Sequence, residues 1–352
     1  MGRRLQPMMG PPQIEQKNPG DLSPRTHWMK GGTMKLKSND PLLRASHEVR
    51  FGGGSTKTRV NHLREVKKFV EELRKQGYGV KHWKNITNKH VGVVVDAWKD
   101  RGLANATMKE YLSGVRAVAE RWGNDRISPK NSDFGIGKRT QVTNKDLSMS
   151  PEKYEFAVSD MKNGNDELNR IAAEMMLMRE LGLRHEEARK FNPNRDVLSD
   201  GRIHVGVGTK AGRERWLQPD AITDKGREAI EYARSVIGDG RGLIKPGLTE
   251  NQWKDKTYRI VRERYGISKK ESNNSFHGLR HAFAHERYER YTGFACRCLF
   301  GSREKFVENA RSVAGDNWER LDHDARELLK SEMGHGPDRN DVIENYLGSR
   351  TS

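Results

Sequence analysis

The stretch SFHGLRHAFAHERYERY, residues 275–291, carries six basic side chains in what is otherwise a helix-forming composition. A helix that served only packing would present an apolar stripe at every third or fourth position. Here the positions are taken instead by His277, Arg280, His281, His285, Arg287 and Arg290. The segment therefore predicts a helix that meets a negatively charged partner.

The charge of the whole chain indicates the class of that partner. Among 352 residues there are 65 Lys and Arg against 48 Asp and Glu, a formal net charge of +17 at pH 7. Such an excess favours a polyanion, nucleic acid above all, although a basic surface can also serve solubility alone. The sequence has no apolar run long enough for a membrane span and no signal-peptide core. We therefore expect a cytoplasmic protein.

The first part of the chain predicts a basic arm followed by a helical domain. Residues 1–55 mix Pro, Gly, Asn and Ser with Lys and Arg, a composition typical of a flexible arm. Residues 56–123 show three helical periodicities, and Thr107 with Glu110 forms a capping box that predicts the start of the third helix. The cations on its polar faces either grip DNA phosphates or are simply solvated; the candidates are Lys57, Arg59, Lys109 and Arg116.

The second part predicts a linker and a larger domain. Residues 124–149 are polar and aperiodic, as in an interdomain linker. Residues 150–352 begin with Ser150 and Pro151, a helix N-cap followed by proline, and are mostly helical in pattern. Only residues 202–217 alternate apolar and polar positions around a Gly-rich centre, which predicts a β-hairpin. The expected fold is thus mainly α with a small β-sheet.

Four segments of the second domain together resemble the tyrosine recombinases, the phage integrase family. They are LGLRHEEARKF (181–191), GTKAGRERWLQP (208–219), SFHGLRHAFA (275–284) and MGHGPDRNDVIENYLG (333–348). One such motif alone is weak, but all four occur in the family's order. The resemblance covers residues from about 56 to 350 and implies a two-domain C-shaped DNA clamp, in which a helical core-binding domain precedes the catalytic domain.

The resemblance also implies roles for individual residues. Arg184 and Arg280 would hold the scissile phosphate, because a guanidinium remains charged and binds two oxygens at once. Tyr346 would be the nucleophile, His277 or His335 would take its proton, and Lys210 would protonate the leaving 5′-oxygen. Side-chain cations would thus replace a metal, and we expect neither a metal ion nor another cofactor.

Each assignment has a simpler alternative. Tyr288 and Tyr291 also follow the H-x-x-R box, and Lys210 could only protect a strand edge. Glu187, which accompanies Arg184, would support that arginine or merely pair with it. Arg213 and Arg215 follow Lys210 closely and are further candidates for DNA contact.

One spacing departs from the family pattern. Arg280 and His335 are farther apart than usual, so residues 292–321 look like an insertion that contacts DNA, contacts a neighbouring subunit or decorates the surface. It contains Cys296 and Cys298, too close for an ordinary disulfide and too few for a zinc ribbon, which we interpret as incidental.

The sequence therefore predicts a site-specific DNA recombinase of a bacterial mobile element or prophage. It would act as a homotetramer on double-stranded recombination sites through a 3′-phosphotyrosine and a Holliday junction, with an accessory DNA-bending or directionality factor as a further partner. The alternatives are a type IB topoisomerase with the same chemistry and an architectural DNA-binding protein whose catalytic residues are vestigial.

Overall fold

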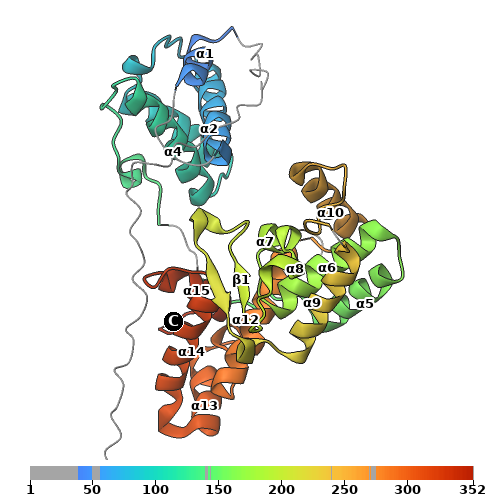
Figure 1. The fold of residues 1–352 in the computed structure, drawn as a ribbon. Helices are drawn as coiled ribbons and strands as arrows, with labels where there is room; N and C mark the ends of the chain where they lie inside the picture. Colours follow the sequence, from blue (N-terminus) through green and yellow to red (C-terminus); the bar gives the residue numbers. More distant parts are fainter. Residues whose placement is uncertain are drawn as a thin grey trace, which may run out of the picture. The chain divides into compact units, whose positions relative to one another are not determined.

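The computed structural model of the chain divides into two units, residues 1–139 and 140–352 (Figure 1). The structure describes residues 39–49, 56–138, 142, 144–238, 240–268, 270 and 275–351. Within that part of the chain both units are mainly helical and the only sheet has two antiparallel strands, which confirms the predicted fold class. None of the described helices is long and apolar enough to cross a membrane.

The first unit is a helical domain built around α2 and α4. Apolar residues one turn apart on α2, such as Val66, Val70 and Leu73, are almost fully buried and pack against α4. The predicted start of the third helix is wrong: Gly102, with φ of 72°, ends the preceding helix, and α4 begins three residues later, before Thr107. The helices are α1 (Pro41–Glu48), α2 (Thr56–Lys75), α3 (Asn88–Asp100) and α4 (Asn105–Arg121), with short 3-10 turns η1 (Trp83–Asn85) and η2 (Asn131–Phe134).

Part of the predicted arm is folded onto this unit. Asp40 caps α1 by accepting hydrogen bonds from the first backbone amides, and Leu42 is fully buried in the core of the unit. Arg74 of α2 donates to Asp40 at 2.7 Å, so the cap is also tied to the domain. The prediction of an unstructured arm is therefore wrong for residues 39–49, while residues 1–38 and 50–55 lie outside the described residues.

The predicted linker is also shorter than expected. Ile127, Phe134 and Ile136 are buried in the core of the first unit. Arg116 of α4 fastens this segment by donating to the backbone carbonyl of Ser128 at 2.9 Å and to a side-chain oxygen at 2.8 Å. The aperiodic sequence failed to reveal this because the segment packs through isolated apolar residues between turns, which give no periodic signal.

The second unit is larger, and its central helix is α6. Most residues of α6 are buried, because α5, α9 and α12 pack around it. The predicted N-cap Ser150, which opens α5, is confirmed, and Thr249 with Gln252 forms a capping box at the start of α10. The helices are α5 (Pro151–Lys162), α6 (Asp166–Glu180), α7 (His185–Lys190), α8 (Pro193–Asp196), α9 (Asp224–Ile237), α10 (Glu250–Tyr265), α12 (Phe276–Thr292), α13 (Arg303–Ala314), α14 (Trp318–Glu332) and α15 (Asn340–Leu347).

The predicted hairpin is confirmed, although its strands are short. β1 (Ile203–Val205) pairs with β2 (Arg215–Leu217), and the 3-10 turn η3 (Lys210–Gly212) lies in the connection between them. Alternate positions point inward, so Ile203, Leu217 and also Arg215 are buried while Trp216 is exposed. The connection can therefore project Lys210 away from the core.

The predicted insertion is an integral part of the second unit. It forms η5 (Arg297–Leu299), α13 and the start of α14, and its buried Phe294, Phe306 and Trp318 share a hydrophobic cluster with Ile343 and Leu347 of α15. Cys296 and Cys298 are buried in the same cluster, so they contribute to its packing and their interpretation as incidental is wrong. The insertion supports the short helix that carries Tyr346.

Candidate active site

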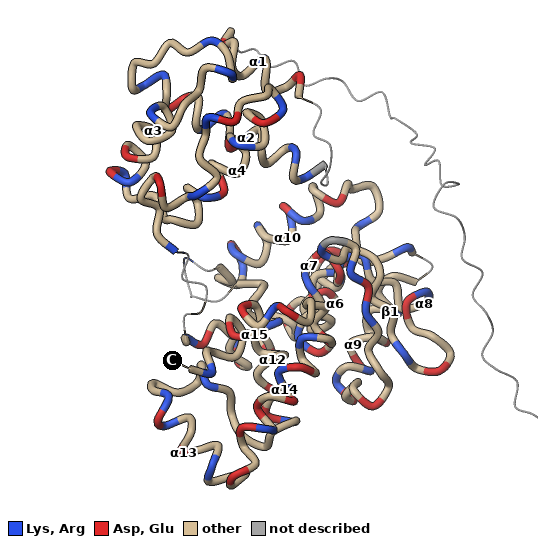
Figure 2. Tube along the Cα trace, turned by 90° about the vertical axis from the view of Figure 1, so that its left-hand side faces the viewer, with Lys and Arg blue, Asp and Glu red and all other residues tan. Residues whose placement is uncertain are grey.

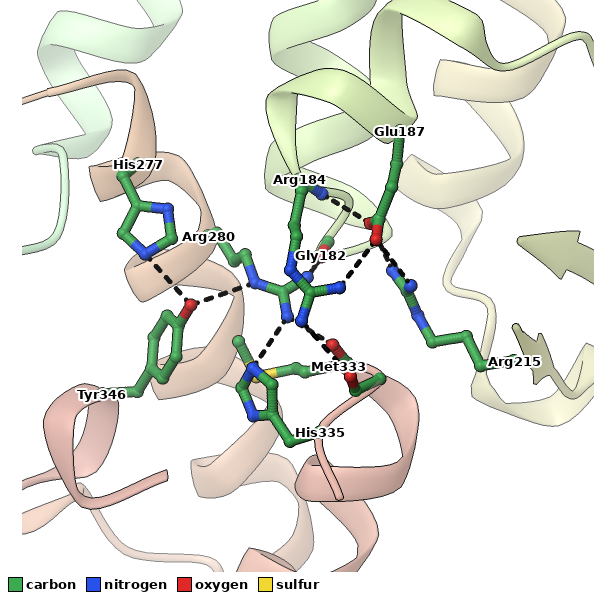
Figure 3. Close-up of polar contacts among 10 residues, drawn as sticks. Gly182, Arg184, Glu187, Arg215, His277, Arg280, Met333, His335 and Tyr346 are labelled. Atoms are coloured by element: carbon green, nitrogen blue, oxygen red, sulfur yellow. Dashed lines mark hydrogen bonds and ion pairs between the residues drawn. The ribbon is translucent and has the colours of Figure 1, made fainter. Parts of the chain in front are cut away.

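Four distant parts of the second unit bring their polar side chains to one place (Figure 3). Arg184 is the N-cap residue of α7, and His277 with Arg280 lies in the first turns of α12. His335 follows α14, and Tyr346 lies near the end of α15. The structure therefore brings together the residues that the sequence singled out in separate motifs.

Gly182 allows the chain to turn between α6 and Arg184. Its φ is 60°, and a Cβ at this position would come within 2.5 Å of the ring of Phe283 on α12. The resulting close approach lets the Gly182 carbonyl accept a hydrogen bond from Nη1 of Arg280. The Leu-Gly-Leu sequence before Arg184 thus couples the two arginine-bearing segments.

The Tyr346 phenol lies between an arginine and a histidine. Nε of Arg280 donates to the phenol oxygen at 3.2 Å, and Nε2 of His277 lies 3.0 Å from the same oxygen. The two competing tyrosines are engaged elsewhere, since Tyr288 donates to Asp322 at 2.7 Å and Tyr291 donates to Glu332. Of the three candidates, Tyr346 is the one that meets the predicted catalytic groups.

Arg280 is held rigidly behind the phenol. It is fully buried, and its Nη2 donates to the Met333 carbonyl and lies 3.2 Å from Nε2 of His335. Burial lowers the pKa of this guanidinium to about 10, so it remains protonated at neutral pH. Arg280 therefore supplies a fixed positive charge to the phenol oxygen.

Glu187 links Arg184 to a second arginine. Its carboxylate accepts hydrogen bonds from Arg184 at 2.7 Å and from both terminal nitrogens of Arg215 at 2.8 and 3.0 Å. Burial alone would raise the pKa of Glu187, but the hydrogen bond and charge of Arg215, with the charges of Arg184 and Arg280, lower it to about 2. Glu187 is thus ionised and positions both arginines.

This pairing corrects the prediction that Arg215 contacts DNA. The side chain is buried and both of its terminal nitrogens are used by Glu187. The signal was present in the sequence, because Arg215 has the same strand parity as the apolar Leu217 and must face the core with it. Arg213, by contrast, is exposed.

The histidines of the site are neutral at pH 7. Loss of solvation, together with the charges of Arg280 and Arg184, lowers the pKa of His277 to about 4, although the residue as a whole is exposed and it is its ring that packs against Tyr346. The same causes lower the pKa of His335 to about 3. A neutral imidazole can accept a proton, so Nε2 of His277 can receive the one on the phenol.

His281 is a further member of the site that the sequence did not assign. Its ring centroid lies 4.5 Å from that of Tyr346, and burial with neighbouring histidines lowers its pKa to about 3. It lies one helical turn after His277, and because residues four apart on a helix are neighbours, this spacing could have predicted that His281 lies beside the site.

The phenol opens onto a cationic pocket of about 330 Å³. Lys210 and Arg213 are exposed at its edge, and Arg184 lines it with about a fifth of its side chain accessible. The lining also includes His277, His335 and Tyr346. Such a pocket can hold an anion beside a nucleophilic oxygen, and a phosphodiester matches both its charge and its chemistry.

The remaining predicted DNA contacts lie on the first unit. Lys57 and Arg59 are exposed on α2, and Lys109 is partly exposed on α4. Arg116 is a correction, because its hydrogen bonds fasten the segment after α4 and leave it half-buried. Figure 2 shows that basic residues on this unit are interspersed with acidic ones, so DNA contact by the three others stays a prediction.

Two protein-family models match most of the chain. Residues 45–128 match the model described as phage integrase, N-terminal, and residues 137–286 match the model described as integrase. No curated protein matches the chain by sequence.

Several solved structures share the fold. A lambda integrase dimer bound to a COC′ core site has a TM-score of 0.56 at 16% identity, with 88% of this chain and 76% of that chain covered. A lambda integrase tetramer bound to a Holliday junction gives 0.54 at 17% identity, over 89% and 77%. A Tn1549 transposon integrase in complex with transposon right end DNA gives 0.53 at 14% identity, over 88% and 95%.

Proposed function

The chain belongs to the phage integrase family of tyrosine recombinases, and on this premise we propose that it is a site-specific DNA recombinase that cuts through Tyr346. The observation that carries the proposal is the phenol oxygen held between Nε of Arg280 and Nε2 of His277 at the edge of a cationic pocket. Few other roles explain a buried tyrosine with both a fixed cation and a neutral base on its oxygen.

In the proposed first step, the Tyr346 oxygen attacks the phosphorus of a DNA phosphodiester. The phenol proton passes to His277, which is neutral at pH 7, while Arg280 stabilises the developing phenolate. Negative charge grows on the non-bridging oxygens, and Arg184, which faces the pocket, is the guanidinium placed to receive it. A phosphorus–tyrosine bond forms as the bond to the 5′-oxygen breaks.

The leaving 5′-oxygen needs a proton, and we assign this role to Lys210. It is exposed at the pocket edge in the hairpin connection, and its side chain forms no hydrogen bond or ion pair with the described residues. The 5′-hydroxyl of a partner strand can then attack the 3′-phosphotyrosine and reverse the chemistry. His335 contacts Arg280 rather than the phenol oxygen, so its role in this scheme is to hold that arginine.

The proposed partners follow from the same chemistry. Strand exchange between two double-stranded sites passes through a Holliday junction and requires four active sites, hence a homotetramer on DNA. Lambda integrase in the solved tetramer is bound to a Holliday junction, which supports this assembly for a chain of the same fold. Integration and excision of a mobile element, helped by an accessory DNA-bending or directionality factor, is the biological use that we propose. The C-shaped clamp remains a prediction.

A nicked suicide substrate tests the proposal. On a duplex nicked just to the 3′ side of the scissile phosphate, the short fragment with the free 5′-hydroxyl diffuses away after cleavage. The wild-type chain should then accumulate a covalent complex, and the nucleotide should map to the peptide containing Tyr346. Tyr346→Phe should abolish that complex while leaving DNA affinity within a few-fold. Tyr291→Phe is the matched control and should still trap DNA, because Tyr291 bonds Glu332 instead.

The alternatives give other outcomes in the same experiment. An architectural protein would bind the duplex equally well with and without Tyr346 and would never form a covalent complex. A type IB topoisomerase would relax supercoiled plasmid that carries no recombination site, whereas the proposed recombinase should leave such a plasmid largely supercoiled.

A further inference from the structure

Behind Tyr346, on the side of its backbone rather than its phenol, two cysteines and a histidine form a buried cluster. Cys296 and Cys298 flank Arg297 at η5, and His285 lies two turns after His277 on α12. The three side chains are at most 7% exposed. Among the described residues they are the one group of histidine, cysteine or acidic side chains close enough to bind a single metal ion.

The distances within the cluster match a tetrahedral zinc site. The two sulfurs are 3.5 Å apart, Sγ of Cys298 lies 3.3 Å from Nε2 of His285, and all three ligand atoms lie within 4.8 Å of one another. With zinc bonds of about 2.3 Å to sulfur and 2.0–2.1 Å to nitrogen, tetrahedral geometry separates neighbouring ligands by roughly 3.5–3.8 Å. Binding therefore needs only small side-chain movements.

The surroundings of His285 also resemble those of a metal ligand. Its other ring nitrogen, Nδ1, lies 3.7 Å from the carboxylate of Asp146. A carboxylate at this position commonly orients a metal-bound imidazole and fixes which nitrogen is free to coordinate. The Tyr346 carbonyl oxygen lies 2.9 Å from Nε2 of His285 and 3.3 Å from Sγ of Cys298, at the remaining side of the cluster.

We propose that His285, Cys296 and Cys298 bind one Zn²⁺ ion, with the Tyr346 carbonyl oxygen at the fourth position. Two thiolates neutralise the charge of the ion, which makes its burial in an apolar cluster favourable, and a site with two sulfur ligands selects zinc over magnesium or calcium. This departs from the expectation, based on sequence, that the chain uses no metal. The ion is structural and does not touch the phosphate pocket.

The site would join three segments at the position that matters for cleavage. Zinc would tie α12 and η5 to the end of α15, directly at the backbone of Tyr346. The packing here is already close, since a Cβ on Gly348 would come within 2.8 Å of the backbone nitrogen of Cys298. Metal binding is independent of the proposed function, whereas an effect of zinc on DNA cleavage rests on it.

Metal content of the purified full-length chain, free of any histidine tag, tests the proposal without DNA. We expect one zinc per chain by mass spectrometry, and Co²⁺ substitution should produce the visible bands of a tetrahedral site and a thiolate-to-cobalt charge-transfer band. Cys296→Ser, Cys298→Ser and His285→Ala should each lose most of the zinc. His323→Ala, which removes an exposed histidine outside the cluster, should retain it.

A wild-type chain without zinc and without a cobalt–thiolate band overturns the proposal, whether or not the variants fold. Zinc that persists in Cys296→Ser and Cys298→Ser also overturns it, because the ion would then lie elsewhere. If zinc is present but no covalent DNA complex forms, the proposed function fails and the metal site stands. If both hold, chelation should slow covalent trapping about tenfold or more without abolishing DNA binding.

Discussion

Replacing Glu187 with glutamine should strongly destabilise the second unit. The carboxylate accepts hydrogen bonds from the backbone and side chain of Arg184 and from both terminal nitrogens of Arg215. Glutamine keeps the shape but removes the charge, and its amide nitrogen faces donors instead of acceptors. Arg184, Arg215 and Arg280 would then lie close together without the carboxylate that offsets their repulsion.

The magnitude follows from the pKa of the carboxyl group. Its depression from 4.5 to about 2 corresponds to a stabilisation of the charged form on the order of 3 kcal/mol. Breaking a buried ion pair by removing one partner costs about 3–5 kcal/mol, which agrees. Because the pKa in the folded state is the lower one, this stability is fully present above about pH 4.5 and is lost as the pH falls toward 2.

Differential scanning calorimetry of the full-length chain at pH 7.5 measures the effect. For a unit of this size, 3 kcal/mol should lower the transition temperature of the second unit by about 6–12 °C and leave that of the first unit unchanged. Glu186→Gln is the matched control: it removes a partly exposed carboxylate paired with Lys190 and should cost less than about 1 kcal/mol. Equal shifts for the two variants would refute the reasoning.

Three further predictions concern the same pocket. Lys210→Ala should slow cleavage about 10²–10⁴-fold. A substrate with sulfur in place of the leaving 5′-oxygen should restore most of the rate, because the sulfur leaves without a proton. A variant that this substrate does not rescue would contradict the general-acid role. Arg215→Met should destabilise the second unit by about 3–5 kcal/mol. Arg213→Met should leave the transition temperature unchanged and weaken DNA binding. The reverse result would count against the assignment of the two arginines. Because the pKa values of His281 and His335 are lowered to about 3, the free energy of unfolding should decline as the pH falls from about 6.5 toward 3, by about 1.4 kcal/mol per pH unit for each histidine. In urea titrations, His281→Asn should flatten this decline. An unchanged slope would argue that His281 is not held neutral.

Most residues of the candidate site could be predicted from the sequence because they lie in short local motifs. Arg184, His277, Arg280, His335 and Tyr346 each lie in a short motif beside a glycine or a helix end, and their roles were predicted from the resemblance of these motifs to the tyrosine recombinases. The hairpin was predicted from its alternation, since strand parity is also a local property.

The errors share one physical cause. Arg116 and Arg215 look like free surface cations in the sequence but are tied to partners that lie elsewhere in the chain. Residues 39–49 and 124–138 look unstructured in the sequence because their apolar residues are isolated and show no periodicity. In the structure a few of these residues, such as Leu42 and Phe134, fix both segments to the core of the first unit. Burial of a polar or aperiodic segment depends on distant partners.

By itself the sequence determined which groups are available and in what order: four cationic motifs, a terminal tyrosine and a hairpin lysine, with glycines where the chain must turn. The tertiary structure alone decided that Arg280 faces the phenol oxygen rather than open solvent, that His277 is the imidazole beside it, and that two cysteines meet His285. Distances between residues far apart in the chain are set by how helices pack, and packing depends on the shape of the whole core rather than on any one segment.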